Sequence, residues 1–221
     1  MISKEKLKDH IEDHFAARRS LQMPPELENP DQYPHLQDEK MEIQEDQPTE
    51  EEVIKALASF KNNKSSGTDR LKTEGLKYNS SNNLVKSIVM LMALIWSCIR
   101  VPSTWLHADI TCLYKKGIRS LASNYRGISI GTNMSRILSK IIVARLKNAY
   151  ERHISNTQFD FRQNRSTTDG LFVMKNIIDK CGEPFVAVYI DLTAAYDHIP
   201  RDFLFKILKL RTGAPRLINI L

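Results

Sequence analysis

The sequence contains little that points to a secreted or membrane protein. Its three cysteines, Cys98, Cys112 and Cys181, lie far apart and form neither a zinc-binding spacing nor a disulfide framework. The longest apolar run, residues 88–99, is shorter than the roughly 20 residues that a membrane-spanning helix needs. Residues 4–15 carry too many charges for a signal peptide. We therefore expect a soluble protein of a reducing intracellular environment, with no membrane partner.

Charge is distributed unevenly along the 221 residues. Residues 1–60 carry 7 Lys and Arg against 15 Asp and Glu, whereas residues 61–221 carry 25 against 11. The densest basic part is 115–165, where 11 Lys and Arg face two acidic residues. A polyanion such as nucleic acid suits this segment, and a solvated basic face is the alternative.

The N-terminal quarter differs in composition from the rest. Five prolines among acidic and amide residues between positions 20 and 48 predict a linker without a core of its own. Thr49 and Glu52 have the spacing of a helix capping box, which predicts the start of the folded domain. We therefore divide the chain into residues 1–48, a charged helix and an acidic Pro-rich linker, and a domain over residues 49–221.

Two long helices are expected within the domain. Residues 83–100 are apolar nearly all round, which is typical of a buried helix. Residues 133–150 place their apolar side chains on one broad face. Arg145 projects into the middle of that face, and a buried guanidinium must be paired. We expect it to meet a carboxylate or a helix C-terminus inside the fold.

Residues 108–131 predict a two-stranded β-hairpin, because apolar residues alternate with other residues in both halves. The expected connecting loop carries four cations, Lys115, Lys116, Arg119 and Arg126. Lysines and a forked guanidinium can offset the charge of a triphosphate. Plain solvated charges are the alternative.

Aromatic and basic side chains alternate further along the chain. Phe159 and Phe161 are interleaved with Arg162 and Arg165, a combination that suits single-stranded nucleic acid. The alternative places both rings in the core and leaves only the arginines exposed. The sequence of residues 166–169 predicts a capping box at the start of another helix.

A short apolar run then ends in a carboxylate. Residues 185–190 are β-branched, aromatic or small and predict a strand that is buried on both faces. Asp191 follows it directly, and Tyr196 comes five residues later. A carboxylate at the end of a buried strand needs a metal, a cation or water, and metal-dependent phosphoryl transfer uses such carboxylates to position Mg²⁺. An ordinary strand end whose Asp caps the next turn is the alternative.

Four segments resemble, in the same order, the reverse transcriptases of LINE-type (non-LTR) retrotransposons. They are Lys64-Ser-Ser-Gly-Thr-Asp69, Asn124-Tyr-Arg-Gly-Ile-Ser-Ile130, Gln158-Phe-Asp-Phe-Arg-Gln-Asn-Arg-Ser-Thr-Thr-Asp169 and Asp191-Leu-Thr-Ala-Ala-Tyr-Asp197. The sequence departs from the family where Asp160 replaces a glycine, and where Tyr114 and Gly127 stand at positions that are proline in many relatives. The resemblance runs from about residue 50 to the end. It implies an α+β fold, the fingers of a right-hand polymerase with an incomplete palm, built mainly of helices with one fingers hairpin and one palm strand.

The resemblance also implies roles for individual residues. Asp191 would bind the catalytic Mg²⁺, and Tyr196 would lie under the incoming sugar and exclude a 2′-hydroxyl. Lys115 and Arg126 would contact the phosphates of the incoming dNTP. Contacts with the RNA template and DNA primer are expected from Lys116, Phe161, Arg162 and Arg165.

One part of a two-metal polymerase is missing from this sequence. The 30 residues after Asp191 contain neither the adjacent Asp pair of the family nor its glycine-glutamine segment, and one aspartate cannot hold two metal ions. The sequence therefore indicates the fingers and first palm segment of an RNA-directed DNA polymerase. When complete, such an enzyme adds dNTPs to a primer 3′-hydroxyl, but we expect no activity from this chain alone.

Two other functions remain open. One is a nucleic-acid-binding remnant of such an element without catalysis, whose RNA binding would depend on salt but not on Asp191. The other is a phosphotransferase that resembles the haloacid dehalogenases and uses Asp191 as its nucleophile. That family places a second Asp two residues on, where this chain has Thr193.

Overall fold

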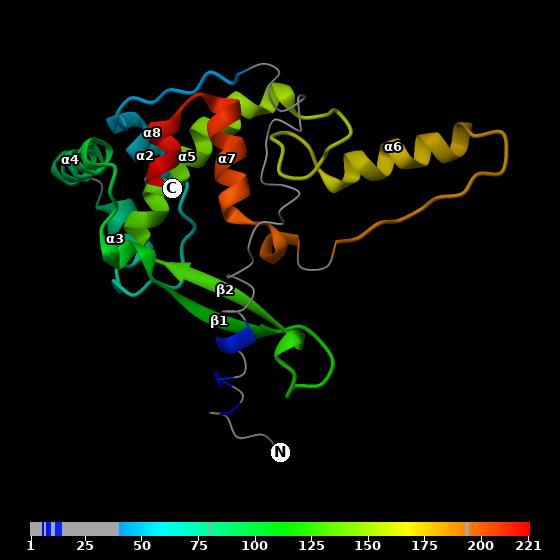
Figure 1. Cartoon of the computed structure of the whole chain (residues 1–221), viewed down its shortest axis with the longest axis horizontal. Coiled ribbons are helices and arrows are strands. Elements are labelled where there is room, and N and C mark those ends of the chain that lie inside the picture. Colours follow the sequence, from blue (N-terminus) through cyan, green and yellow to red (C-terminus); the bar gives the residue numbers. More distant parts are fainter. Residues whose placement is uncertain (1–5, 7, 10–11, 15–39, 80, 193–194) are drawn as a thin grey trace.

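The structure, a computed structural model, describes residues 6, 8–9, 12–14, 40–79, 81–192 and 195–221. It consists of a helical body, a β-hairpin and a projecting arm (Figure 1). The helices are α2 (Glu50–Ala58), α3 (Thr73–Tyr78), α4 (Asn82–Cys98), α5 (Asn133–Tyr150), α6 (Thr167–Lys180), α7 (Arg201–Thr212) and α8 (Pro215–Ile220). Short 3-10 turns are η4 (Ser103–Leu106), η5 (Ala122–Asn124), η6 (Glu151–His153) and η7 (Ala195–His198). In the described part of the chain, no helix is long and apolar enough to cross a membrane.

The core lies where α2, α4, α5 and α8 meet. Each helix turns one apolar stripe inward, as the 3.6-residue period requires. The largest fully buried side chains include Trp96 of α4, Phe60 after α2, and Ile137, Ile141 and Ile142 of α5. Leu217 of α8 closes the same cluster from the C-terminal side. The core therefore joins residues 53–142 to the last few residues of the chain.

Helix α5 matches its expected range of 133–150 at both ends. Thr132 caps its N-terminus, where the Thr132 side chain accepts a hydrogen bond from the Ser135 amide at 3.2 Å. The expected capping box of α2 is also confirmed: the Thr49 side chain accepts from the Glu52 amide, and the Glu52 carboxylate accepts from the Thr49 amide. Both helices contribute buried residues to the core.

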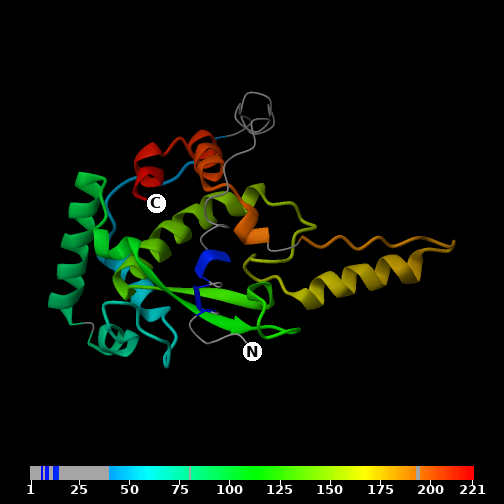
Figure 2. The same cartoon turned by 60° about the horizontal axis from the view of Figure 1, so that its bottom comes forward.

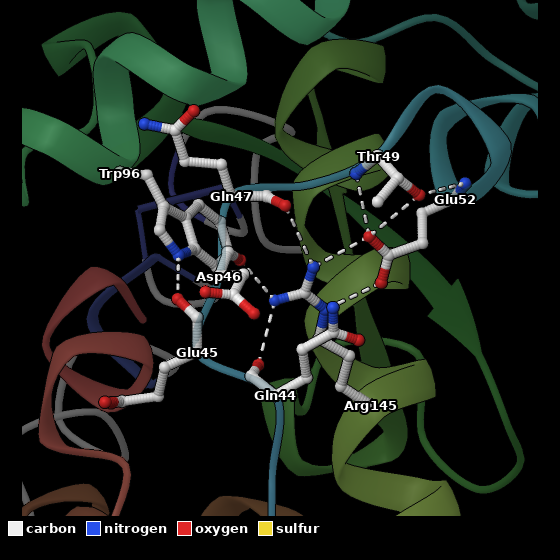
Figure 3. Close-up of polar contacts among 8 residues, drawn as sticks. All are labelled: Gln44, Glu45, Asp46, Gln47, Thr49, Glu52, Trp96 and Arg145. Atoms are coloured by element: carbon white, nitrogen blue, oxygen red, sulfur yellow. Dashed lines mark hydrogen bonds and ion pairs between the residues drawn. The ribbon is translucent and has the colours of Figure 1, made fainter.

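Arg145 lies inside this body with 7% of its surface exposed. Its Nε and Nη2 donate to the two oxygens of Glu52 at 2.6 and 2.7 Å. Its Nη1 donates to the Gln44 and Asp46 carbonyls at 2.9 and 2.6 Å (Figure 3). The carboxylate partner expected for Arg145 is thereby confirmed, and the backbone of the preceding segment provides further acceptors.

The segment 40–48 is packed against the body, although its composition predicted a linker. Met41 and Pro48 are buried. The Trp96 indole donates to the Glu45 carbonyl at 2.8 Å (Figure 3). The Glu45 carboxylate accepts from the Arg216 amide at 2.9 Å. Backbone carbonyls, which no composition reveals, hold this segment in place.

The expected β-hairpin is confirmed as β1 (Ala108–Tyr114) paired antiparallel with β2 (Tyr125–Gly131). Their register pairs Ala108 with Gly131 at the base and Tyr114 with Tyr125 at the tip. The ribbon extends away from the helical body (Figures 1 and 2). Most of its side chains are exposed, so the alternation seen in the sequence does not produce a buried face here.

Two expectations about burial are wrong. Residues 83–100 do form a helix, α4, but it buries one stripe and exposes Met90 and Leu94 on the other side. Residues 185–190 are extended but belong to no sheet, with Val186 and Ile190 89% and 86% exposed. A strand needs a neighbour for its backbone hydrogen bonds, and no described segment pairs with this one.

Helix α6 begins with the expected capping box of Ser166 and Asp169. It projects from the body, and the extended segment after it returns toward α7 (Figures 1 and 2). None of its described residues is buried, so the apolar stripe along it faces solvent. Residues 167–192 thus form an arm without a core of their own.

Candidate functional site

The tip of the hairpin is braced by side chains that bond to loop carbonyls. The Tyr114 hydroxyl donates to the Gly117 carbonyl at 2.6 Å, and the Tyr125 hydroxyl donates to the Arg119 carbonyl at 2.9 Å. The Asn124 amide donates to the Ile118 carbonyl at 2.8 Å. Gly117 has φ +96° and lies against Asn124, a conformation that favours glycine. A loop with these four fixed points holds its backbone in one shape.

Three of the predicted phosphate-binding cations are exposed at this tip. Lys115 and Lys116 follow β1, and Arg126 lies on β2 opposite Leu113 rather than in the loop as expected. None of the three forms an ion pair with another described residue. The guanidinium of Arg119 instead stacks 5.2 Å from the centre of the Tyr114 ring. The tip therefore presents unneutralised positive charge on a rigid support, which suits a polyanion.

The loop before α6 is fixed by its arginines. Arg162 is 10% exposed, and its Nε donates to Glu151 at 2.9 Å while its Nη1 donates to the Ser155 carbonyl at 3.0 Å. Arg165 lies 6.0 Å from the centre of the Phe159 ring. Arg162, predicted to contact nucleic acid, is thus engaged inside the protein, whereas Arg165 is exposed.

The two phenylalanines of this loop have different environments. Phe159 is half-buried and packs on Gly170, where a Cβ atom would lie 3.3 Å from its ring. Phe161 is 77% exposed, and its ring meets Tyr196 edge to face at 6.3 Å between centroids. The alternative that buried both rings is therefore wrong for Phe161.

Asp191 lies at the end of the extended segment with its side chain exposed. Tyr196 is on η7 and is 75% exposed. Among the described residues, no group of three or more His, Cys, Asp or Glu side chains could hold a metal ion. Tyr196 contacts Phe161, and Asp191 precedes Tyr196 by five residues in the sequence. Asp191 forms no ion pair with the described hairpin cations Lys115, Lys116 and Arg126.

A junction at the base of the hairpin was not anticipated in this form. Asp69 accepts from the Asn133 amide at 3.3 Å and the Leu71 amide at 3.2 Å. The fully buried Asn133 side chain donates to the Leu71 carbonyl and accepts from Arg136 at 2.9 Å. Gly67 packs so closely on Gly131 that a Cβ would lie 2.8 Å from the Thr132 amide nitrogen. The sequence signal for this junction was the spacing of Gly67 and Asp69. In the structure these two residues contact the end of β2 and the start of α5.

Two cations on α5 form cation–π contacts with one aromatic ring. Arg136 and Lys140 lie 5.0 and 5.2 Å from the centre of the buried Phe60 ring, and Lys140 donates to the Ser59 hydroxyl at 2.8 Å. Burial, together with the neighbouring Arg136 charge, lowers the pKa of Lys140. These cations stabilise the body and are not free for a ligand.

Comparison with known proteins finds similarity to one protein family and to one transposon protein. Residues 113–219 match the family described as reverse transcriptase (RNA-dependent DNA polymerase). A Xenopus laevis protein described as the transposon TX1 uncharacterized 149 kDa protein is 23% identical over 194 residues. That alignment covers 86% of this chain and 15% of the Xenopus protein, so the chain spans a small part of that relative's length.

Proposed function

We propose that this chain forms the fingers and first palm segment of an RNA-directed DNA polymerase, within a reverse transcriptase domain of the kind found in LINE-type (non-LTR) retrotransposons. The observation that carries the proposal is the family match over residues 113–219. That single stretch includes the cationic tip of the hairpin, the loop before α6 and the segment from Asp191 to Tyr196. A right-hand architecture with residues 49–221 as the domain, after a leading segment of residues 1–48, is part of the same proposal.

In this proposal the hairpin tip receives the incoming dNTP. Lys115 and Arg126 offset the charge of the triphosphate, because both are exposed without an ion-pair partner among the described residues. Tyr196 selects the sugar, since a ring under the nucleotide excludes a 2′-hydroxyl by its bulk. The primer 3′-hydroxyl then attacks the α-phosphate, and the new phosphodiester bond forms as pyrophosphate leaves.

The RNA template would contact those predicted nucleic-acid-binding residues that are exposed. Lys116, Phe161 and Arg165 offer charge and a stacking face to single-stranded RNA. Arg162 would contribute indirectly, since its bonds to Glu151 and Ser155 hold the loop that carries Phe161. RNA template, DNA primer and dNTP are the proposed partners.

Reverse transcriptases use divalent metal ions, which we propose to be Mg²⁺ in this protein. The described residues do not fit a complete site of this kind, because Asp191 is a single carboxylate with no second ligand cluster among them. Two-metal catalysis needs carboxylates from more than one element. We therefore assign Asp191 only the role of one proposed metal ligand and expect no polymerase activity from the 221 residues alone.

A non-catalytic nucleic-acid-binding protein is the second candidate, and the lone carboxylate favours it. Both candidates predict that the 221-residue chain binds single-stranded RNA and that this binding weakens with salt. Lys116→Ala should reduce the slope of log K against log salt by about 0.7, the value expected for one phosphate contact on a single strand. Fluorescence anisotropy over a salt series measures this slope.

Two controls belong to this experiment. Lys86→Ala removes an exposed lysine from α4, on the helical body, and should leave the slope unchanged. Asp191→Ala should also leave RNA binding unchanged. RNA binding that is insensitive to salt, or equal slopes for the Lys116 and Lys86 variants, would count against the hairpin as the nucleic-acid surface.

A further inference from the structure

Phe161 combines an unfavourable backbone conformation with an exposed ring. Its φ is +61°, a region that bulky residues rarely adopt, and its side chain is 77% exposed. Burial of an apolar ring cannot compensate for the strain, because the ring is not buried. A strained residue that persists on a surface is held by its surroundings, and such residues cluster at functional sites.

The loop on both sides of Phe161 is fixed to the protein. On one side, Phe159 packs on Gly170 beneath the guanidinium of Arg165. On the other side, Arg162 bonds to Glu151 and to the Ser155 carbonyl. The positive φ of Phe161 therefore lies between two fixed points of the loop.

The ring of Phe161 meets the ring of Tyr196. The two centroids are 6.3 Å apart and the ring planes are inclined by 86°, the edge-to-face arrangement that aromatic pairs prefer. Tyr196 is itself 75% exposed, so this contact limits the rotation of a side chain that is otherwise largely surrounded by solvent. A ring that must exclude one hydroxyl group has to keep one orientation.

We propose that Phe161 is a positioning residue for Tyr196 and thereby contributes to the choice of deoxyribonucleotides over ribonucleotides. This inference rests on the sugar-selecting role proposed for Tyr196. In this role Phe161 acts through the orientation of the Tyr196 ring and needs no contact with the incoming dNTP.

Phe161→Gly is the most direct variant, because glycine adopts φ +61° without strain and the substitution removes the entire benzyl side chain. Phe161→Tyr keeps an aromatic ring at the same place. Phe172→Ala is the matched control, since Phe172 is also an exposed phenylalanine, 67% exposed on α6. Each variant is prepared with 3-fluorotyrosine, and Tyr196→Phe identifies the signal of Tyr196 in the ¹⁹F spectrum.

We expect Phe161→Gly to shift the Tyr196 signal, while Phe161→Tyr keeps a ring-shifted signal and Phe172→Ala leaves it unchanged. In the protein expressed from its complete native reading frame, Phe161→Gly should lower discrimination between dNTP and rNTP by roughly three- to tenfold, the worth of one aromatic pair. Phe161→Tyr should retain most of the discrimination.

The outcomes separate this inference from the function on which it rests. An unmoved Tyr196 signal in Phe161→Gly overturns the inference whatever Tyr196 does. A shifted signal with unchanged discrimination overturns it as well, provided that Tyr196→Val lowers discrimination. If Tyr196→Val also leaves discrimination unchanged, the proposed role of Tyr196 fails and the role of Phe161 fails with it.

Discussion

Replacing Arg145 by methionine is expected to lower the free energy of unfolding by about 3–5 kcal/mol. Methionine replaces the apolar stem of the arginine but leaves the Glu52 carboxylate without its bidentate partner. It also removes the donors to the Gln44 and Asp46 carbonyls (Figure 3). Chemical denaturation followed by circular dichroism measures the change.

Lys147→Met is the matched control for this prediction. Lys147 is exposed two residues further along α5, so its loss should change stability by less than about 0.5 kcal/mol. Equal effects of the two substitutions would show that the Arg145 contacts contribute nothing to the fold. A double-mutant cycle with Glu52→Gln isolates the part that comes from the ion pair.

The same pair predicts how stability depends on pH. Burial tends to raise the pKa of Glu52, but hydrogen bonds from Arg145 and Thr49 and the Arg145 charge outweigh it, so the pKa is lowered from its usual value of 4.5. A carboxyl whose pKa is lower in the folded state stabilises the protein above its unfolded pKa. We therefore expect this contribution to be complete above about pH 5 and lost as the pH falls through the lowered pKa, and Glu52→Gln should remove this acid dependence.

Gly67→Ala is expected to destabilise the protein by about 1–3 kcal/mol, whereas Gly75→Ala should stabilise it by about 0.5–1 kcal/mol. A Cβ at position 67 would lie 2.6 Å from the Gly131 carbonyl carbon and 2.8 Å from the Thr132 nitrogen. Both are backbone atoms, which cannot rotate away as a side chain can. A Cβ at Gly75, within α3, meets nothing within 4 Å and gains helix propensity.

The pair of glycine variants tests the junction beneath the hairpin. Because Gly131 ends β2 and Thr132 caps α5, the displacement in Gly67→Ala should spread to the first turn of α5. Amide exchange at Asn133 and Ser135 should accelerate in this variant and not in Gly75→Ala. Equal stabilities of the two variants would contradict the close packing of Gly67.

Local sequence patterns predicted the elements whose stability is local. Helix α5 carries a wide apolar stripe, and the capping boxes at Thr49 and Ser166 have a spacing that fixes a helix start. The hairpin followed from alternation in both strands. The position of Arg145 within an apolar face predicted that it needs a partner, and a carboxylate was one of the expected kinds. The sequence did not show that this carboxylate is Glu52.

Features that depend on distant neighbours could not be read in the same way. The segment 40–48 looks like a linker because it is acidic and contains proline, yet Arg145 and Trp96 hold it through main-chain carbonyls. The apolar residues of 185–190 predicted a buried strand, but a strand forms only beside another strand. The contact between Phe161 and Tyr196 joins residues that no periodicity relates.

Template-directed DNA synthesis on RNA tests the central claim most directly. In the protein expressed from its complete native reading frame, primer extension with dNTPs on an RNA template should be detectable. Asp191→Asn should reduce it by a factor on the order of 10³ while leaving RNA binding unchanged. Extension that survives this substitution, or none by the unaltered complete protein, would contradict the assignment of this chain to an RNA-directed DNA polymerase.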